Sequence, residues 1–235
     1  MEFYKGHNLI KHLVLILLCL LGNYSLYSQV YSKKIIYKYQ VENSSAEGIK
    51  KKQIMYLVCN GKAWVFDPQK QFSVGWVDEG KDISSPNSST GVIDNGDTVW
   101  LHPPRHDIYF VHEFTPFPEV RFPLTVGKQW TTDFGYVWPS KELNIPNGVK
   151  VKHHYKVVSQ FEEYSNILQR NINCFKVEGW LNHPLIQSKW IGVFNKELGF
   201  IRMEFFNINK SITKMTLSDS FDWDQCKKRF GLFSL

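Results

Sequence analysis

The chain has 235 residues, of which 43% are hydrophobic and 15% aromatic, so it is long enough to bury the core of one sizeable domain without disulfide staples. Its formal net charge is +6, and Lys and Arg are spread along the sequence except for two tight runs at 50–52 and 227–229. A charge this mild and this dispersed excludes nucleic-acid binding as the expected function.

The first 28 residues have the three parts of a secretory signal. Lys5 and Lys11 give a cationic start, an apolar run of nine residues occupies 13–21, and a polar stretch leads to Ser28. At about 1.5 Å per residue such a run cannot cross a hydrocarbon core of roughly 30 Å. We therefore expect cleavage after Ser28 and no transmembrane helix in the mature chain; the alternative is a buried helix that opens the domain. The predicted location is the periplasm, cell envelope or exterior of a Gram-negative bacterium.

The cysteines fit an exported protein that does not depend on disulfides. Lipid modification of Cys19 is an alternative fate for the signal, although Leu18 stands where a small residue is preferred. The mature chain keeps Cys59, Cys174 and Cys226, and this odd number allows at most one intramolecular disulfide.

Strand-length runs rich in β-branched and aromatic residues fill the sequence after position 29. Ile35, Tyr37, Tyr39 and Val41 alternate with polar neighbours, which is the period of a half-buried strand. Further strands are expected at 72–77, 107–113, 151–157, 172–180, 187–194, 201–205 and 210–217. A helical stripe is present only over 160–169, proline clusters mark loops at 103–104, 116–123 and 139–146, and 80–90 is expected to be a flexible surface loop.

An Asn-Gly pair predicts a tight hairpin at Asn60-Gly61, because both turn positions need positive φ. The turn would join strands at 54–59 and 62–66 and place Leu57 opposite Trp64. Both faces of these strands are apolar, so we expect them to lie centrally in the sheet.

A second Asn-Gly pair, Asn95-Gly96, predicts a hairpin from 91–94 into 97–102. Asp94 and Asp97 would then face each other across the turn. A weak calcium site is one interpretation, and carboxylates that splay into water are the other.

These elements predict an all-β chain in which residues 29–235 form a single β-rich domain. About ten antiparallel strands in one curved sheet or half-barrel, with short helical or irregular additions, would surround an apolar concavity, which the chain's own loops could plug. The aromatic residues of 219–235 indicate a tail that packs against the domain.

A resemblance covers roughly residues 150–218. A strand Asn173-Cys174-Phe175-Lys176-Val177 precedes a strand with Trp190, then Phe194–Arg202 (FNKELGFIR), then Ile212-x-x-Met215-x-Leu217. This order resembles secreted, β-rich bacterial proteins of unknown function whose half-barrels are similar to lipoprotein-carrier folds. The resemblance implies a fold and an envelope location, and it brings no catalytic residue.

The most suggestive polar stretch runs from His102 to Glu113 and includes Arg105, His106 and His112. If 106–112 is a strand, His106 and His112 lie about 20 Å apart, too far to share a metal ion. We therefore predict no metal site and no cofactor. The Pro-Pro bend before Arg105 could instead present its guanidinium to an anion.

Elsewhere, His153 falls on the apolar face of its strand and is predicted to be a hydrogen-bonded core histidine, with His154 on the opposite, lysine-bearing face. Cys174 alternates with packing residues and has no histidine or aspartate at a catalytic spacing. No nucleophile elbow, metalloprotease or phosphate-loop motif occurs in the sequence, so no catalytic residue is assigned.

Aromatic side chains could line a lipid cavity or form plain core, and core is the commoner role in β domains. If there is a ligand, the residues predicted to contact it are Trp64, Trp100, His102, Arg105, Phe110 and Trp190.

Three functions remain open from the sequence. The favoured one is a non-catalytic envelope protein that binds a hydrophobic small molecule or an envelope protein. The alternatives are a structural or assembly component of the envelope and an exported hydrolase built on the His102–Glu113 stretch.

Overall fold

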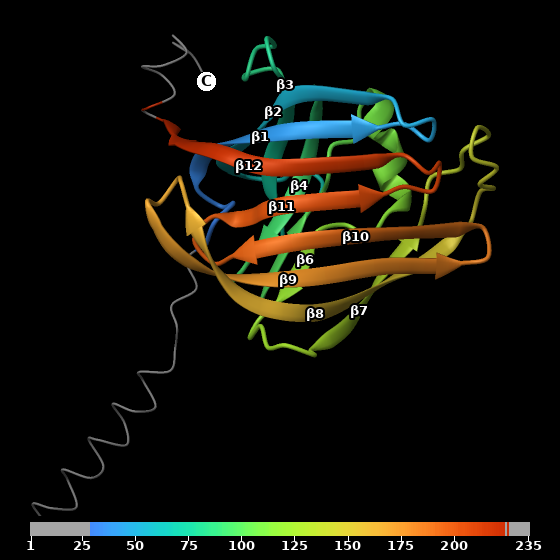
Figure 1. The fold of residues 1–235 in the computed structure, drawn as a ribbon. Coiled ribbons are helices and arrows are strands. Elements are labelled where there is room, and N and C mark those ends of the chain that lie inside the picture. The colour runs from blue at the N-terminus through green and yellow to red at the C-terminus, as the bar shows by residue number, and fades with distance from the viewer. Residues whose placement is uncertain (1–28, 224, 226–235) are drawn as a thin grey trace, which may run out of the picture.

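A computed structural model describes residues 29–223 and 225 and shows one antiparallel sheet of twelve strands (Figure 1). The elements are β1 (Lys34–Ser44), β2 (Lys50–Ala63), β3 (Phe72–Asp78), β4 (Ser88–Asp94), β5 (Thr98–Leu101), the 3₁₀-helix η1 (Asp107–Phe114), β6 (Glu119–Arg121), β7 (Gln129–Tyr136), β8 (Lys150–Ser165), β9 (Arg170–His183), β10 (Ile186–Asn195), β11 (Gly199–Phe206) and β12 (Ile212–Asp222). The predicted all-β class and single curved sheet are confirmed, with two strands more than the ten expected. None of the helices in these residues is long and apolar enough to cross a bilayer.

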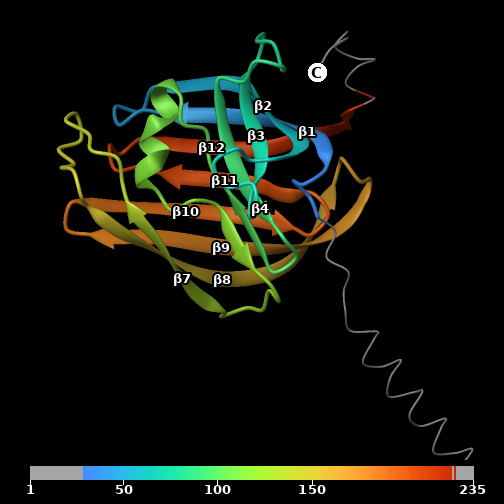
Figure 2. The same ribbon diagram turned by 180° about the vertical axis from the view of Figure 1, so that it is seen from behind.

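The sheet curls until its two edges meet. Its strand order is β6-β5-β4-β3-β2-β1-β12-β11-β10-β9-β8-β7, so the edge strands β6 and β7 are neighbours in the sequence. Thr132 of β7 donates to the Glu119 carboxylate of β6 at 2.7 Å, and Arg121 Nη2 donates to Thr132 Oγ1 at 2.8 Å. In Figure 2, β3 and β4 cross in front of the long C-terminal strands, which leaves an interior between the two halves of the sheet.

Large side chains fill that interior. Alternate residues of each strand point inward, as in β8, where Val151, His153, Tyr155 and Val157 are buried between exposed or half-exposed neighbours. The largest fully buried side chains are Tyr31, Tyr37, Tyr39, Trp76, Tyr109, Phe114, Phe117, Tyr155, Trp190, Phe194, Phe200 and Phe205. The expected apolar concavity is therefore occupied by the protein's own aromatic rings.

The outer face of β1–β3 is also covered, and this explains why β2 is apolar on both faces. Ile36, Tyr56, Val77 and Phe221 form a second cluster there, and Ile83 from the loop before β4 packs onto it. The prediction of a central position for this part of β2 is confirmed. The prediction that 80–90 is a flexible surface loop is wrong at Ile83, which is buried, and from Ser88 onward, where β4 begins.

Asn60-Gly61 is not a hairpin turn. Gly61 has the predicted positive φ of 69°, but the two residues form an irregularity within β2, where its register against β3 shifts between Cys59 and Ala63. The true turn follows at 64–71, and Leu57 pairs with Tyr37 and Trp76 rather than with Trp64. A positive φ serves a bulge as well as a turn, so the dipeptide alone did not decide between them.

Asn95-Gly96 does form the predicted hairpin, between β4 and β5. Asn95 Oδ1 accepts the backbone N–H of Thr98 at 2.9 Å, and Gly96 has a φ of 88°. The expected opposition of Asp94 and Asp97 is wrong, because Asp94 pairs with Val99 and its side chain is buried. No cation is needed to separate these two carboxylates.

Two further secondary-structure predictions are wrong. Residues 107–113, expected as a strand, form η1, whose buried residues Tyr109 and His112 are three apart, as are Val111 and Phe114. Residues 160–169, expected to be helical, form the last part of β8 and the turn that leads to β9, because β8 continues to Ser165 in register with β9.

The ends of the chain are described only in part. The predicted signal (1–28), Cys226 and the aromatic residues Phe230 and Phe233 lie outside the described residues. Within them, β12 continues to Asp222 and buries Phe221, so the start of the predicted packed tail is an extension of the sheet.

Candidate functional site

The segment from His102 to Glu113 lies at one end of the curled sheet. The register of the strands brings the β1–β2, β9–β10 and β11–β12 turns and the β7–β8 loop to this same end, which we call the turn end. Figure 2 shows η1 on the concave side of the sheet, across the ends of β1, β12 and β11. The polar residues of the stretch therefore face into the molecule or onto its rim.

Side chains of η1 fix it to the strands below. Asn43 Nδ2 of β1 donates to Tyr109 Oη at 2.9 Å, and the ring of His112 stacks on Phe205 with 4.3 Å between centroids. His112 Nε2 lies 3.1 Å from Thr213 Oγ1, and its Nδ1 lies 3.3 Å from the carbonyl of Pro104. The carbonyl can only accept, so Nδ1 carries the proton and Thr213 donates to Nε2. Burial lowers the pKa of His112 to about 3, so the ring is neutral at physiological pH.

The C-terminal end of η1 is held in the same way. Ser188 Oγ of β10 donates to the Phe114 carbonyl at 2.6 Å, and Thr115 Oγ1 donates to Asn207 Oδ1 at 3.0 Å. These bonds satisfy polar groups that would otherwise be buried without a partner. The helix is thus a fixed part of the fold.

His102 and Glu113 form a second buried pair. His102 Nδ1 donates to the Pro103 carbonyl at 2.8 Å, which leaves the lone pair of Nε2 facing Glu113 Oε1 at 3.4 Å. Burial lowers the pKa of His102 to about 4 and raises the pKa of Glu113 to about 7, although the charge of Arg105 lowers the latter. The acid is therefore protonated below about pH 7, and its Oε1 faces a neutral imidazole.

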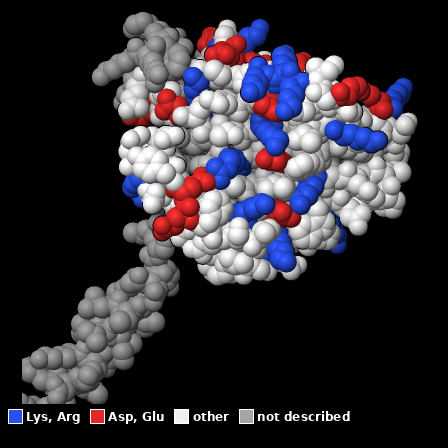
Figure 3. All heavy atoms as spheres, viewed as in Figure 1, with Lys and Arg blue, Asp and Glu red and all other residues white. Residues whose placement is uncertain are grey.

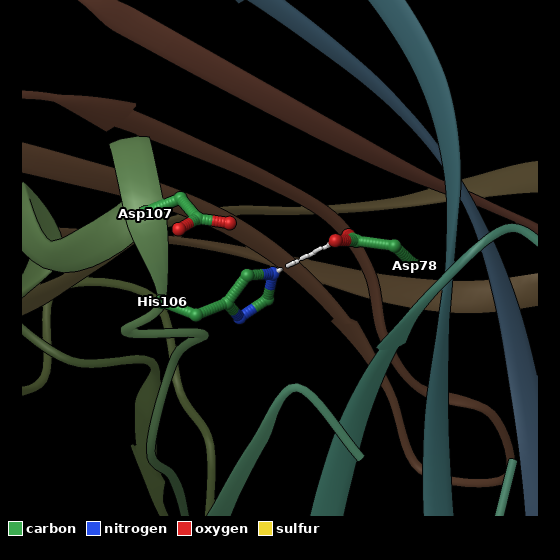
Figure 4. Close-up of side chains that lie close together, drawn as sticks. All are labelled: Asp78, His106 and Asp107. Atoms are coloured by element: carbon green, nitrogen blue, oxygen red, sulfur yellow. Dashed lines mark hydrogen bonds and ion pairs between the residues drawn. The ribbon is translucent and has the colours of Figure 1, made fainter. Parts of the chain in front are cut away.

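His106 has a third, separate set of partners (Figure 4). Its Nε2 faces the Asp78 carboxylate at 3.2 Å, and its Nδ1 lies 3.2 Å from Ser88 Oγ. Asp107, the first residue of η1, directs its carboxylate toward the same place. The three histidines of the stretch thus have different partners and do not share one cleft.

Ser88, His106 and Asp78 have the residue types of a nucleophilic triad, but the position of the serine does not suit that chemistry. Ser88 is 7% exposed and pairs with Trp76 in the β3–β4 ladder. A substrate carbonyl has no open approach to a hydroxyl this buried. We assign Ser88 the role of fixing the orientation of the His106 ring.

A cavity of about 390 Å³ opens at the turn end, between η1 and the surrounding loops. Its apolar wall comes from Ile49, Ile108, Phe110, Val111 and Leu143, and its polar wall from Asn43, Ser44, Ser45, Lys51, Asp107, Ser140, Glu142, Asn209, Ser211 and Thr213. We call this cavity the rim pocket. Ile108 and Phe110 are 57% and 41% exposed, although the helix that carries them is otherwise tightly packed.

The residues predicted to contact a ligand are dispersed. Phe110 lines the rim pocket, and Trp190 is fully buried in the core. The ring centroids of Trp100 and His102 lie 5.9 Å apart, and both rings pack against Phe117.

The other two lie apart from that pocket. Arg105 is exposed and donates to the Ser89 carbonyl at 3.4 Å, and Trp64 packs near Phe66 in the β2–β3 loop. Of the six residues predicted to contact a ligand, Phe110 is therefore the only one that borders the rim pocket.

His153 lies where the sequence placed it. It is fully buried, stacks on Phe134 at 4.8 Å, and has its Nδ1 3.4 Å from Tyr155 Oη. Burial lowers its pKa to about 3. His154 points the other way and stacks on Trp180, as predicted for the outer face.

The convex face differs in character from the turn end. Figure 3 shows Lys and Arg side chains interspersed with Asp and Glu over the strands. Ion pairs such as Lys189–Glu178 at 2.8 Å and Lys214–Glu204 at 3.5 Å join neighbouring strands there. Exposed apolar side chains at the turn end include Ile49, Ile108, Phe110, Trp138 and Leu185.

Comparison with known proteins gave structural neighbours only. No protein-family model and no curated protein matches the chain. An exported-type protein with a YmcC-like fold from Bacteroides fragilis has a TM-score of 0.40 at 12% identity, with 83% of this chain and 99% of that chain covered. The hypothetical lipoprotein YmcC from Escherichia coli has a TM-score of 0.35 at 11% identity, with 84% and 93% covered. A LolA superfamily protein from Nitrosomonas europaea has a TM-score of 0.31 at 7% identity, with 86% and 92% covered.

At such low identities and TM-scores these likenesses carry no conclusion about ligand or activity, and the family resemblance of residues 150–218 stays a prediction.

Proposed function

We propose that this chain is an exported, non-catalytic binding protein whose rim pocket takes an amphipathic small molecule. The observation that carries the proposal is the exposure of Ile108 and Phe110 beside the pocket. Every other large apolar residue of η1 is buried, so the exposure of these two side chains is not a general property of the helix.

The composition of the pocket wall defines the class of ligand. One side offers aliphatic and aromatic carbon, and the other offers amide, hydroxyl, carboxylate and ammonium groups from residues such as Asn43, Lys51 and Glu142. Small-molecule sites in proteins combine an apolar lining with a few polar groups in volumes of roughly 300–1,000 Å³. An apolar tail against Phe110 and a polar head toward Lys51 would satisfy both walls.

The rim is a better ligand site than the interior. The aromatic rings of the core, including Trp190 and Phe200, fill the space between the two halves of the sheet. A ligand there would have to displace well-packed side chains, whereas the rim pocket is already open.

The test is a titration with an amphipathic fluorophore, 1-anilinonaphthalene-8-sulfonate, followed by competition with a medium-chain fatty acid. We expect saturable uptake of one fluorophore per chain. Phe110→Ser should weaken it about tenfold, because a buried aromatic contact contributes on the order of 1.5–3 kcal/mol and tenfold corresponds to about 1.4 kcal/mol. Phe66→Ser is the matched control, since Phe66 is 81% exposed in the β2–β3 loop, away from the rim pocket.

Absence of saturable uptake, or equal loss in both variants, would contradict the small-molecule proposal. In that case the exposed apolar residues of the turn end would point to the envelope-partner alternative. A photo-crosslinking residue at position 110 would then be expected to capture a protein during export, and the same residue at position 66 would not.

A further inference from the structure

The cluster at the start of η1 has the composition of a metal site. We propose that Asp78, His106 and Asp107 bind a divalent transition-metal ion of borderline softness, with Zn²⁺ as the test ion. This inference does not depend on the proposed ligand function, although Asp107 also lines the rim pocket.

The geometry of the three side chains suits a metal ion. One ligand atom from each residue can be chosen so that all three lie within 4.8 Å of one another. His106 Nε2 and Asp78 Oδ2 are 3.2 Å apart, and ligands at about 2.1 Å from one ion are separated by roughly 3.0–3.5 Å. The exposed Asp107 carboxylate is the third ligand of the set (Figure 4).

The histidine is already oriented for this task. The His106 side chain is 9% exposed, and Ser88 Oγ at 3.2 Å from Nδ1 fixes the ring so that Nε2 faces the two carboxylates. Histidine ligands in metalloproteins characteristically use their second nitrogen in this way. The buried contact of Ser88 with His106, which does not suit catalysis, would orient a histidine that binds a metal ion.

The charge balance also calls for a cation. Asp78 accepts a hydrogen bond from the Gln53 amide at 3.3 Å, but among the described residues no Lys or Arg lies within ion-pair distance of Asp78 or Asp107. The ligand oxygens of the two carboxylates lie within 4.8 Å of each other and repel, and His106 offsets that repulsion only when its ring is protonated. A bound dication would offset it with the imidazole neutral.

The donor set selects the kind of ion. Imidazole nitrogen favours Zn²⁺ and its neighbours in the first transition row, whereas Mg²⁺ and Ca²⁺ prefer oxygen donors alone. Three protein ligands leave at least one coordination position for water or for an anionic group of a bound molecule.

The test is isothermal titration of the untagged protein with Zn²⁺, with Ca²⁺ and Mg²⁺ in parallel, and visible absorption spectra with Co²⁺. We expect one equivalent of Zn²⁺ to bind, no comparable binding of Ca²⁺ or Mg²⁺, and Co²⁺ bands of a low-coordinate site. His106→Ala should weaken Zn²⁺ binding by roughly 100-fold or more, and Ser88→Ala by about 10-fold.

Two further variants separate loss of the site from loss of the fold. Asp107→Asn changes an exposed carboxylate that the fold does not use, and Asn tolerates its φ of 46°. It should weaken Zn²⁺ binding and leave the unfolding midpoint of the metal-free protein unchanged. His154→Ala, on the convex face, should bind Zn²⁺ like the parent protein.

Lack of one-equivalent binding would overturn the proposal. So would binding that survives both His106→Ala and Asp107→Asn, or Ca²⁺ binding as tight as that of Zn²⁺. Equal loss of affinity in His154→Ala would show scattered surface binding and would also overturn it.

Discussion

Asp94, at the end of β4, is a fully buried carboxylate whose partners are backbone amides. Its Oδ2 accepts the N–H groups of Val30 and Tyr31 at 2.7 Å each and of Ser32 at 3.1 Å. The segment that precedes β1 is thereby fixed to the β4–β5 hairpin. Three converging donors replace the hydration that Oδ2 loses on burial, whereas Oδ1 is buried without a hydrogen-bond partner.

Replacing Asp94 by Ala should therefore destabilise the fold strongly. The change leaves three buried amide donors without an acceptor, and we expect a loss of about 3–5 kcal/mol in the free energy of unfolding by urea. Asp97→Ala, in the exposed tip of the same hairpin, is the control and should change that free energy by less than about 0.5 kcal/mol. Equal effects of the two substitutions would show that the amide contacts contribute nothing.

Glu113 gives the stability a dependence on pH. Burial raises the pKa of Glu113 from 4.5 to about 7, so between these values the folded state keeps a proton that the unfolded state has lost. The contribution of Glu113 to the free energy of unfolding is therefore fully present below pH 4.5. It falls as the pH rises and is absent above about pH 7. The lowered pKa values of His102 and His112 have the opposite effect, because they reduce the free energy of unfolding as the pH falls below 6.5.

Glu113→Gln isolates the contribution of the acid, because glutamine mimics the protonated carboxyl at every pH. Relative to the variant, the parent protein should lose about 3 kcal/mol of unfolding free energy between pH 4.5 and pH 7.5. Urea unfolding of both proteins at the two pH values measures this difference. A difference that does not change with pH would show that Glu113 is ionised in the fold.

At the scale of elements, the start of β11 illustrates how a turn is fitted to a distant segment. Gly199 has a φ of 74°, and a Cβ there would clash with the Tyr31 hydroxyl. Tyr31 is held in place, because it is fully buried and its hydroxyl oxygen accepts a hydrogen bond from the Phe200 amide at 2.7 Å. Glycine is needed at 199 for its conformation and for the close approach of Tyr31.

Gly199→Ala should therefore cost more than the same change at Gly48. Gly48 has a φ of 83°, but a Cβ there would meet nothing within 4 Å. We expect about 1 kcal/mol of lost stability at Gly48 and a further 1–3 kcal/mol or so at Gly199. Urea unfolding of the two single variants measures the difference, and equal losses would show that Tyr31 can move aside without cost.

The element that sequence reasoning missed is η1, which carries the site. Its period of three is visible in the sequence at Tyr109 and His112, but the run of apolar and charged residues also fits a strand. The contacts of His112 with Thr213 and Phe205 decide in favour of the helix, and both lie about one hundred residues further along the chain. Such long-range contacts cannot be inferred from local periodicity.

At the scale of the whole molecule, one core joins the two halves of the sheet through the pairing of β1 with β12. Cys59 of β2 and Cys174 of β9 are buried free thiols on opposite sides of that pairing. Burial raises the pKa of Cys59 well above its ordinary value and that of Cys174 to about 11. Both effects suppress the reactive thiolate.

We expect both thiols to resist alkylation by iodoacetamide in the native protein. They should become reactive together, over one narrow range of guanidinium chloride concentration, because a single core protects them. Mass spectrometry of the peptides that contain each cysteine follows the two sites separately. Separate transitions would mean that the two halves of the sheet unfold independently.

The sequence by itself determined the all-β class and the inward face of β8. It also determined the Asn95-Gly96 turn, because periodicity and turn chemistry are local properties of the chain. Only the tertiary structure decided that Asp78 and Ser88 meet His106, since their approach depends on the β3–β4 register and on the position of η1. It also decided that aromatic rings fill the interior and that Phe110 is left exposed at the rim. Packing of side chains far apart in the sequence sets those outcomes, and a pattern within one strand cannot encode them.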